Sequence, residues 1–347
     1  MQVGPVRFVT TGDGFRIAYT ITGIGTPLIV IPPGLHDMQS LWGFKPVWMN
    51  GLAERFQVVV LDVRGRGLSS HGLTEAHSYT DYELDIAAVI DVLNLDAICL
   101  FAVGGFAHNL IRYAIANPQR VKALIFNNTP LSVAAYPRSY MEGLAAENWH
   151  LFITTLTPQG ADAKAVREWR ERLLLPGVRE DWAIASAVNS GSSVEQELPQ
   201  LQAPCLVFHS RDHHLLGLDE TMRFAERIPD ARIVLIDGNP MDALGAVEGL
   251  PALDSFLHDI GLVPPPPAQL APVPGAEADD EVAVRLSLSA RQVEVLKLLA
   301  EGRTTREISE RLVLSERTVE RHIADVYNKI GARNRAEATA YALRHYT

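Results

Sequence analysis

Cysteine is scarce in this chain. The 347 residues include two cysteines, Cys99 and Cys205. Both stand in apolar, β-branched runs, which predicts two packed thiols rather than a disulfide or a metal pair. The chain also lacks an apolar run of the roughly 18 residues that a membrane span needs. Its first residues, MQVGPVRFVTTGDG, have neither the basic start nor the apolar core of a signal peptide. We expect a cytoplasmic protein without a membrane partner.

Positive charge is also in short supply. The chain has 31 Lys and Arg against 41 Asp and Glu, a net charge of -10, which argues against nucleic-acid binding by the whole molecule. The charge is unevenly spread, however, because residues 281–347 hold 12 basic and 9 acidic residues, a balance of +3 that leaves -13 for the rest. A mildly basic tail on an acidic body predicts two units with different partners.

A stretch rich in Pro and Ala separates these two units. Residues 261–280 read GLVPPPPAQLAPVPGAEADD, a composition that has little to bury and favours extended polyproline conformations. We therefore expect three parts: a first domain over residues 1–262, a semi-rigid linker over residues 263–283, and a small helical domain over residues 284–347.

The first domain alternates between short apolar runs and helical patterns. Six runs are typical of buried strands: PLIVIPP, FQVVVLD, AICLFAV, VKALIFNN, CLVFHS and ARIVLID. Segments such as residues 80–93 and 109–116 have helical spacing between them. This alternation predicts an α/β fold with a mainly parallel sheet. Between about residues 131 and 199 the strand pattern stops and tryptophans stand among helix formers, which predicts a helical cap.

Two motifs give the first domain a family resemblance. DVRGRGLSS, residues 62–70, matches a D-x-R-G-x-G-x-S turn at the end of a strand, and YAIANPQRVKALIF matches the helix and strand that follow a nucleophile elbow. On these motifs, residues 1–262 resemble the α/β-hydrolase fold. The resemblance implies a nucleophile on a tight strand-to-helix turn, G-x-S-x-G. Here that turn reads AVGGF and the nucleophile position is Gly104, with no Ser, Thr, Cys or Asp between Leu100 and His108.

Two further parts of the hydrolase machinery have changed. Asp212 stands at the acid position, but Asn239 occupies the place of the general-base histidine, and residues 215–257 contain no histidine. The oxyanion loop reads PPG at residues 32–34 instead of H-G, and proline has no amide hydrogen to donate. Together the three departures predict no catalytic residue and no cofactor, but a pocket retained for binding. An enzyme of unrecognised mechanism fused to a DNA-binding domain, and a sensor of a protein partner, remain as alternatives.

Family position also selects candidate ligand contacts for a small, largely apolar molecule. They come from the oxyanion loop, the elbow, the cap, the acid loop and the histidine loop: Leu35, His36, Gly104, Gly105, Trp149, Trp182, His213, Asn239 and Met241. Five histidines, His36, His108, His209, His213 and His214, suggest a metal site at first sight. Their spacing matches no familiar ligand set, so we expect no metal.

The last 60 residues predict a different fold. Apolar residues recur at helical spacing in four segments, the last of which carries Ala336, Ala340 and Leu343. Ser289, Thr304 or Thr305, and Ser315 can cap the first three helices. A short link joins the second helix to the third, as in a helix-turn-helix.

The run LSERTV, followed by H and then NKIGARNRAEA, resembles the LuxR-type helix-turn-helix. The resemblance implies that residues 315–330 carry a recognition helix for the major groove and that the last helix, from about Asn334, pairs two protomers. It places Glu320, Arg321 and Ala324 toward the bases, with Ser315 at the start of the helix. Thr305, Arg317, Thr318 and Lys329 are expected at phosphates. We therefore expect a homodimeric transcriptional regulator that binds double-stranded DNA and responds to a small-molecule effector.

Overall fold

The computed structural model describes residues 4–44, 46–136, 138–157, 163–213, 215–237, 248–262, 290–300, 303–312 and 314–330, together with Ala338 and Ala342. The chain divides into two compact units, residues 1–268 and 269–347. This division falls within the predicted linker. Because residues 263–289 lie outside the described part, the predicted limits at 262 and 284 stay predictions. Within the described ranges, no helix is long and apolar enough to cross a membrane.

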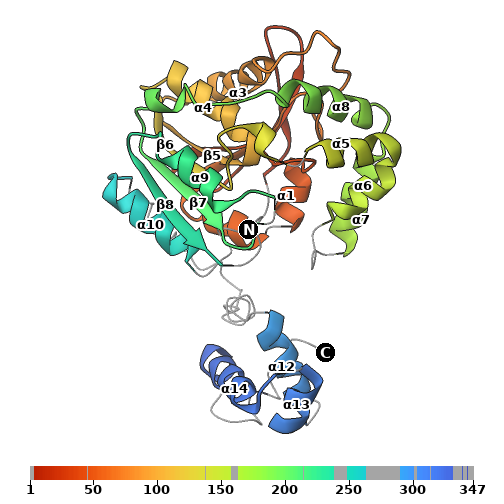
Figure 1. Cartoon of the computed structure of the whole chain (residues 1–347). Helices are drawn as coiled ribbons and strands as arrows, with labels where there is room; N and C mark the ends of the chain where they lie inside the picture. Colours follow the sequence, from red (N-terminus) through yellow and green to blue (C-terminus); the bar gives the residue numbers. More distant parts are fainter. Residues whose placement is uncertain are drawn as a thin grey trace, which may run out of the picture. The chain divides into compact units, whose positions relative to one another are not determined.

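The first unit is built on an eight-stranded sheet with the order β1-β2-β4-β3-β5-β6-β7-β8 (Figure 1). Its strands are β1 (Arg7–Thr10), β2 (Arg16–Thr22), β3 (Thr26–Val30), β4 (Phe56–Asp62), β5 (Ile98–Val103), β6 (Val121–Asn127), β7 (Cys205–Ser210) and β8 (Ala231–Ile236). β2 pairs antiparallel with both β1 and β4, and every pairing from β4 to β8 is parallel. The mainly parallel α/β fold is confirmed, whereas β1 and β2 were not among the predicted strands.

Helices cover both faces of this sheet. The helices α3 (Asp81–Val92), α4 (Ala107–Ala116) and α9 (Leu218–Ala225) pack on one face, and α1 (Met38–Phe44), α2 (Pro46–Ala53) and α10 (Gly249–Asp259) pack on the other. Side chains alternate along each strand, so Val59 of β4 joins the first core and Val58 the second. Cys99 and Cys205 are free and buried, as predicted.

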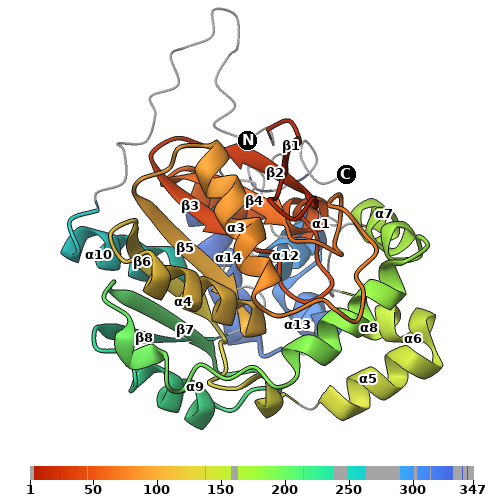
Figure 2. The same cartoon turned by 90° about the horizontal axis from the view of Figure 1, so that it is seen from above.

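Four helices lie between β6 and β7 in the chain, within the region predicted as a cap. They are α5 (Arg138–Glu147), α6 (Trp149–Thr155), α7 (Ala163–Leu173) and α8 (Val178–Asn189). Figures 1 and 2 show them grouped together to one side of the sheet. Their shared core contains Trp149, Phe152 and Trp169. The aromatic residues of this region therefore form the core of the cap, whether or not any of them also contacts a ligand.

The second unit contains α12 (Ala290–Ala300), α13 (Thr305–Leu312) and α14 (Glu316–Ile330). Thr304 caps α13 in a reciprocal arrangement: the Glu307 N–H donates to Thr304 Oγ1 over 3.3 Å, and the Thr304 N–H donates to Glu307 Oε2 over 2.8 Å. Beyond residue 330 the structure describes Ala338 and Ala342, which are helical and pack with Leu296 of α12. The predicted contacts Ala336, Ala340 and Leu343 lie outside the described residues.

Candidate functional site

The tip of the elbow carries a glycine in a left-handed conformation. β5 ends at Val103 and is followed by the short 3-10 helix η1 (Gly104–Phe106), which leads into α4. Gly104 has a φ of 65°, in the left-handed region that residues with a Cβ rarely adopt. The hydroxyl of Tyr136 lies 3.2 Å from the position that a Cβ on Gly104 would take, and it donates to the Asn128 carbonyl over 2.9 Å. The turn therefore keeps the shape of a nucleophile elbow without its nucleophile.

A cavity of about 510 Å³ lies at this elbow, between the sheet and the cap. Six of the residues predicted as ligand contacts line it: Leu35, His36, Gly104, Gly105, Trp182 and His213. Its lining also includes residues that the sequence analysis did not select, among them Arg66, Tyr136, Glu142, Phe152, Trp169 and Ser186. The volume and the largely apolar walls are in the range that small-molecule sites occupy.

Of the other three predicted contacts, one is placed outside the cavity lining. Trp149 does not line the cavity, because its indole packs inside the cap against Trp182 at a centroid distance of 5.6 Å, and its Nε1–H donates to the Leu173 carbonyl over 2.9 Å. Its role is to support the Trp182 ring, which does line the cavity. Asn239 and Met241 lie outside the described residues.

The two histidines in the cavity wall are held in different ways. The His36 ring stacks on Trp169 with centroids 5.5 Å apart and an interplanar angle of 20°. Nδ1 of His213 accepts the backbone N–H groups of Leu215 over 3.2 Å and Leu216 over 2.9 Å. A neutral His213 therefore carries its proton on Nε2 and presents a donor there, whereas a general base needs a bare nitrogen.

The other candidate histidines serve the interior of the fold. His108 Nε2 lies 2.9 Å from the Pro130 carbonyl and Nδ1 lies 2.7 Å from Ser192 Oγ, and burial lowers the pKa of this imidazole to about 4. His209 Nδ1 lies 2.8 Å from Thr221 Oγ1, and its pKa is also lowered by burial. His214 lies outside the described residues. Within the described ranges, no group of three or more His, Cys, Asp or Glu side chains is placed to hold a metal ion.

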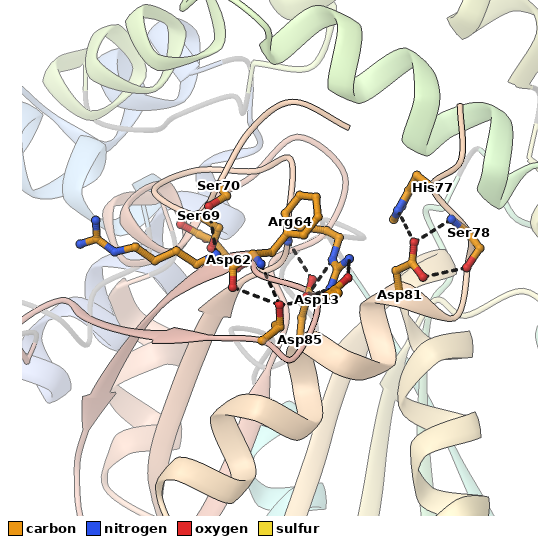
Figure 3. A network of polar contacts seen from close by, with 12 residues as sticks. Asp13, Asp62, Arg64, Ser69, Ser70, His77, Ser78, Asp81 and Asp85 are labelled. Atoms are coloured by element: carbon orange, nitrogen blue, oxygen red, sulfur yellow. Dashed lines mark hydrogen bonds and ion pairs between the residues drawn. The ribbon is translucent and has the colours of Figure 1, made fainter. Parts of the chain in front are cut away.

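The DVRGRGLSS motif holds the turn after β4 together. Arg64 is almost fully buried and pairs with Asp85 over 2.8 Å and with Asp13 over 2.6 Å (Figure 3). Asp62 accepts the N–H groups of Met38 and Leu68 over 2.7 and 3.0 Å; burial, and secondarily the nearby Asp37, raise its pKa to about 7. These contacts show that the motif is structural in this chain.

Ion pairs and hydrogen bonds tie the cap to the loops around the cavity. Arg172 of α7 donates to both carboxylate oxygens of Asp37 over 2.6 and 3.0 Å. Asp181 of α8 accepts the N–H groups of Gly72 and Leu73 and lies 2.7 Å from His71 Nδ1. The cap is thus attached to these loops by charged contacts at two points.

In the second unit, α14 has a buried and an exposed face. Val319 and Val326 are fully buried, while the predicted base-facing residues Glu320, Arg321 and Ala324 are exposed. No carboxylate of the described residues pairs with Arg321. Arg306 of α13, by contrast, forms an ion pair with Glu310 over 3.1 Å.

The predicted phosphate contacts around α14 are less uniform. Ser315 is exposed, and its Oγ accepts the Thr318 N–H over 3.2 Å, so this hydroxyl caps the helix. Thr305 and Thr318 are half-buried. The side chains of Arg317 and Lys329 lie outside the described part of the chain.

Comparison with known families assigns both units. Residues 44–239, more than half of the chain, match the family described as serine aminopeptidase, S33. The chain belongs to this α/β-hydrolase family. Residues 286–342 match the family described as bacterial regulatory proteins, luxR family, so the second unit is a LuxR-type helix-turn-helix domain. The protein is a transcriptional regulator with a hydrolase-like domain, and its luxR domain implies DNA binding.

Individual relatives reflect the same division. N-formylmaleamate deformylase of Pseudomonas putida is 25% identical over 242 residues, which cover 65% of this chain and 86% of the relative. The transcriptional regulatory protein LiaR of Bacillus subtilis is 40% identical over 60 residues, 17% of this chain and 28% of LiaR. The crystal structure of a bromoperoxidase from Bacillus anthracis has a TM-score of 0.61 at 17% identity, covering 74% of this chain and all of that one. At that identity it shows the fold alone.

Proposed function

We propose that this regulator senses a small molecule directly, in the cavity at the elbow of its hydrolase-like domain. In the proposed mechanism, a largely apolar ligand occupies the cavity of the first unit and changes the affinity of the second unit for DNA. The protein acts as a homodimer, with one LuxR-type domain on each half-site. The observation that carries the proposal is Gly104, which keeps the elbow and the cavity but removes the nucleophile.

Several features support binding over turnover. The elbow offers no nucleophilic side chain, and the Tyr136 hydroxyl borders the space where one would stand. His213, the cavity histidine from the acid loop, presents a donor on Nε2 because its Nδ1 accepts two backbone N–H groups. In the sequence, Asn239 replaces the base of the triad. Hydrolysis of this type needs a nucleophile at the elbow and a histidine with a bare nitrogen beside it. The lack of a nucleophile at Gly104 and of a bare Nδ1 on His213 therefore supports binding.

The cavity supports a small molecule over a protein partner as the signal. Its aromatic walls, Phe152, Trp169 and Trp182, come from the cap, so a ligand inside contacts the sheet domain and the cap at once. A ligand that prefers one cap position over another shifts the population between them, which is the requirement for regulation by binding. The charged ties of Arg172 and Asp181 are the contacts that such a shift would alter.

The DNA-reading proposal rests on α14. Exposed Arg321 has the geometry to read guanine through two hydrogen bonds, and Glu320 can accept from a cytosine amino group. A single domain with a charge balance of only +3 over residues 281–347 binds DNA weakly, so two domains on half-sites about one helical turn apart give the affinity. Because the target would be chromosomal DNA, we also infer a cytoplasmic location.

The test uses the full-length protein. Native mass spectrometry and thermal shift against a metabolite library identify compounds that stabilise it, while hydrolysis of the esters and lactones in the library is monitored in parallel. DNA fragments that the protein binds are selected from a random pool. The apparent Kd of the protein for these fragments is then measured with and without each stabilising compound. Stabilisation without turnover, together with a changed Kd, supports the proposal. Turnover of a bound compound would show an active enzyme instead.

A cavity-filling variant makes this test specific. Gly104→Trp places an indole at the elbow and should abolish the ligand-dependent change in Kd, while leaving ligand-free DNA binding in place. Gly104→Ala is the matched control, because it imposes the same left-handed conformation on a residue with a Cβ without filling the cavity. If Gly104→Trp responds to ligand as the wild type does, the ligand binds elsewhere.

A further inference from the structure

One charged side chain in the cavity has no ion-pair partner among the described residues. Arg66 is the one arginine or lysine among the described residues that line the cavity. No carboxylate of the described residues lies within ion-pair distance of its guanidinium, and its Nε is buried without a hydrogen-bond acceptor. Arginine stays protonated in proteins, so the cavity wall holds a cation on which the buried Asp62 acts only from beyond ion-pair distance.

The neighbouring arginines show how unusual this is within the chain. Arg64, two residues earlier on the same turn, pairs with Asp13 and Asp85. Arg172 of the cap pairs with Asp37, and Arg112 of α4 lies 2.9 Å from Glu197. The fold supplies carboxylates to the arginines that it uses structurally. Among these four, Arg66 is the one that lines the cavity, and no ion pair with a described carboxylate holds it.

The position of Arg66 is fixed next to the elbow. Its guanidinium carbon lies 4.6 Å from the centre of the Phe106 ring, which belongs to η1 directly after Gly104 and Gly105. The first amides of a helix have no carbonyl partner within it and favour negative charge. η1 leads straight into α4, so the cation and the start of a helix converge on the space that Gly104 leaves open. Both favour an anionic group there.

A carboxylate from the cap also lines the cavity. It belongs to Glu142 of α5, and Ser186 of α8 donates to Glu142 Oε1 over 3.0 Å. The walls also include the cap side chains Phe152, Trp169 and Trp182. An anionic group is therefore attracted toward Arg66 and repelled from Glu142, which gives a bound ligand a defined direction.

We infer that the effector is a carboxylic acid with an apolar body, whose carboxylate binds Arg66 at the elbow and whose body lies against the aromatic rings of the cap. The inference rests on the proposed sensing function and specifies its ligand. A carboxylate matches the two-pronged donor geometry of one guanidinium and balances its single charge. A phosphate monoester carries nearly two charges and would leave the second uncompensated in an apolar cavity.

The binding test compares acids with their neutral analogues. Phenylacetate, 4-phenylbutyrate and 1-naphthylacetate are titrated into the full-length protein by calorimetry, each beside its methyl ester and its primary amide. We expect each acid to bind at least about tenfold more tightly than its neutral analogues, since charge-assisted pairing is lost in the latter. Arg66→Gln should remove this preference and leave the affinity for the amides unchanged. Arg66→Lys should restore it in part, because lysine keeps the charge but not the two-pronged geometry.

Three results would overturn the inference: equal or tighter binding of the neutral analogues, an acid preference that survives in Arg66→Gln, or no binding of any of the acids. Failure of the proposed function looks different. If the acids bind through Arg66 but leave the Kd for DNA unchanged, the ligand class stands and direct sensing fails. If neutral compounds bind and change the Kd for DNA independently of Arg66, the proposed sensing function stands and the inference of a carboxylic acid ligand is wrong.

A measurement without ligand gives a second test. Arg66→Met keeps an unbranched stem over Phe106 and removes the uncompensated charge, so it should raise the Tm of the ligand-free protein. Arg64→Met is the matched control on the same turn and should lower the Tm, because it leaves Asp13 and Asp85 without their cation. A lower Tm for Arg66→Met would show that Arg66 stabilises the fold and is not reserved for a ligand.

Discussion

The hydroxyl of Tyr136 stands 3.2 Å from the point where a side chain on Gly104 would begin, and it is anchored there by its hydrogen bond to the Asn128 carbonyl. At Gly104 itself the backbone has a φ of 65°. A residue with a Cβ would therefore be strained by its own backbone and pressed against a fixed phenol. The glycine and the tyrosine fit each other, so a side chain added at position 104 meets two obstacles at once.

The first prediction is that Gly104→Ser does not restore hydrolysis. The new hydroxyl meets Tyr136, and His213 offers it no bare nitrogen because its Nδ1 accepts a backbone N–H. The left-handed conformation should cost about 1–2 kcal/mol of folding free energy. Chemical denaturation measures the stability, and release of 4-nitrophenolate from its acetate ester measures turnover.

Gly104→Ala serves as the control for this variant, since it carries the same backbone strain without a hydroxyl. The two variants should lose similar stability and have the same background rate. Faster ester cleavage by Gly104→Ser than by Gly104→Ala would mean that a working base remains at the elbow, and the catalytic alternative would have to be reopened.

The second prediction concerns the tie between cap and sheet. Arg172→Ala leaves the Asp37 carboxylate, which is 5% exposed, without its cation. Removing one partner of a largely buried pair should cost at least about 2 kcal/mol. Arg170→Ala, on the same helix, loses hydrogen bonds to the Thr157 hydroxyl alone and should cost less than half as much. Equal losses in urea denaturation would show that the Arg172–Asp37 pair does not hold the cap.

The third prediction is a dependence of stability on pH that traces to His108. Burial lowers its pKa to about 4, against about 6.5 in an unfolded chain, so the unfolded state takes up a proton first as the pH falls. Stability is therefore lost between about pH 6.5 and pH 4, by up to about 3 kcal/mol. Above pH 6.5 this contribution is constant.

His108→Gln isolates that contribution. Its amide can donate to the Pro130 carbonyl and accept from Ser192 as the neutral imidazole does, but it does not titrate. The difference in free energy of unfolding between wild type and variant should change by the equivalent of one proton across this pH range. A difference that stays constant from pH 7 to pH 4 would place the acid sensitivity in other groups.

The sequence was informative about the sheet where burial is complete. β5 is buried at all six positions and β7 likewise, and such strands produce continuous apolar runs that stand out without any alignment. β1 and β2 escaped notice for the opposite reason. β1 has four residues, most of them exposed, and the alternation in Arg16–Thr22 mixes arginine and threonines with apolar residues. A short edge strand leaves little pattern in a sequence.

The cavity lining was predictable where family position fixes the course of the backbone. It was less predictable where side-chain packing determines which residues reach the cavity. Gly104, Gly105, Leu35 and His36 line the cavity because loops after parallel strands meet at one edge of the sheet. In the sequence, Trp149 and Trp182 are equally good candidates as cap aromatics. That Trp182 lines the cavity while Trp149 packs behind it could not be predicted from the sequence. Arg66 was hidden inside a motif that is otherwise structural; the signal was a second arginine in RGRG.

The last prediction separates base reading from general attraction to DNA. Arg321→Ala removes an exposed cation, paired with no carboxylate of the described residues, from the proposed groove-facing side of α14. It should lower the ratio of specific to non-specific affinity by about tenfold or more. Arg306→Ala is the matched control, because Arg306 is also exposed but pairs with Glu310 on α13. It should change both affinities slightly and leave their ratio unchanged.

The measurement is the Kd of each variant for a selected operator and for a scrambled fragment at one fixed salt concentration, since phosphate contacts depend strongly on salt. If Arg321→Ala weakens both fragments equally, Arg321 contacts the backbone, and base selection must come from other side chains of α14, with Glu320 next to be tested.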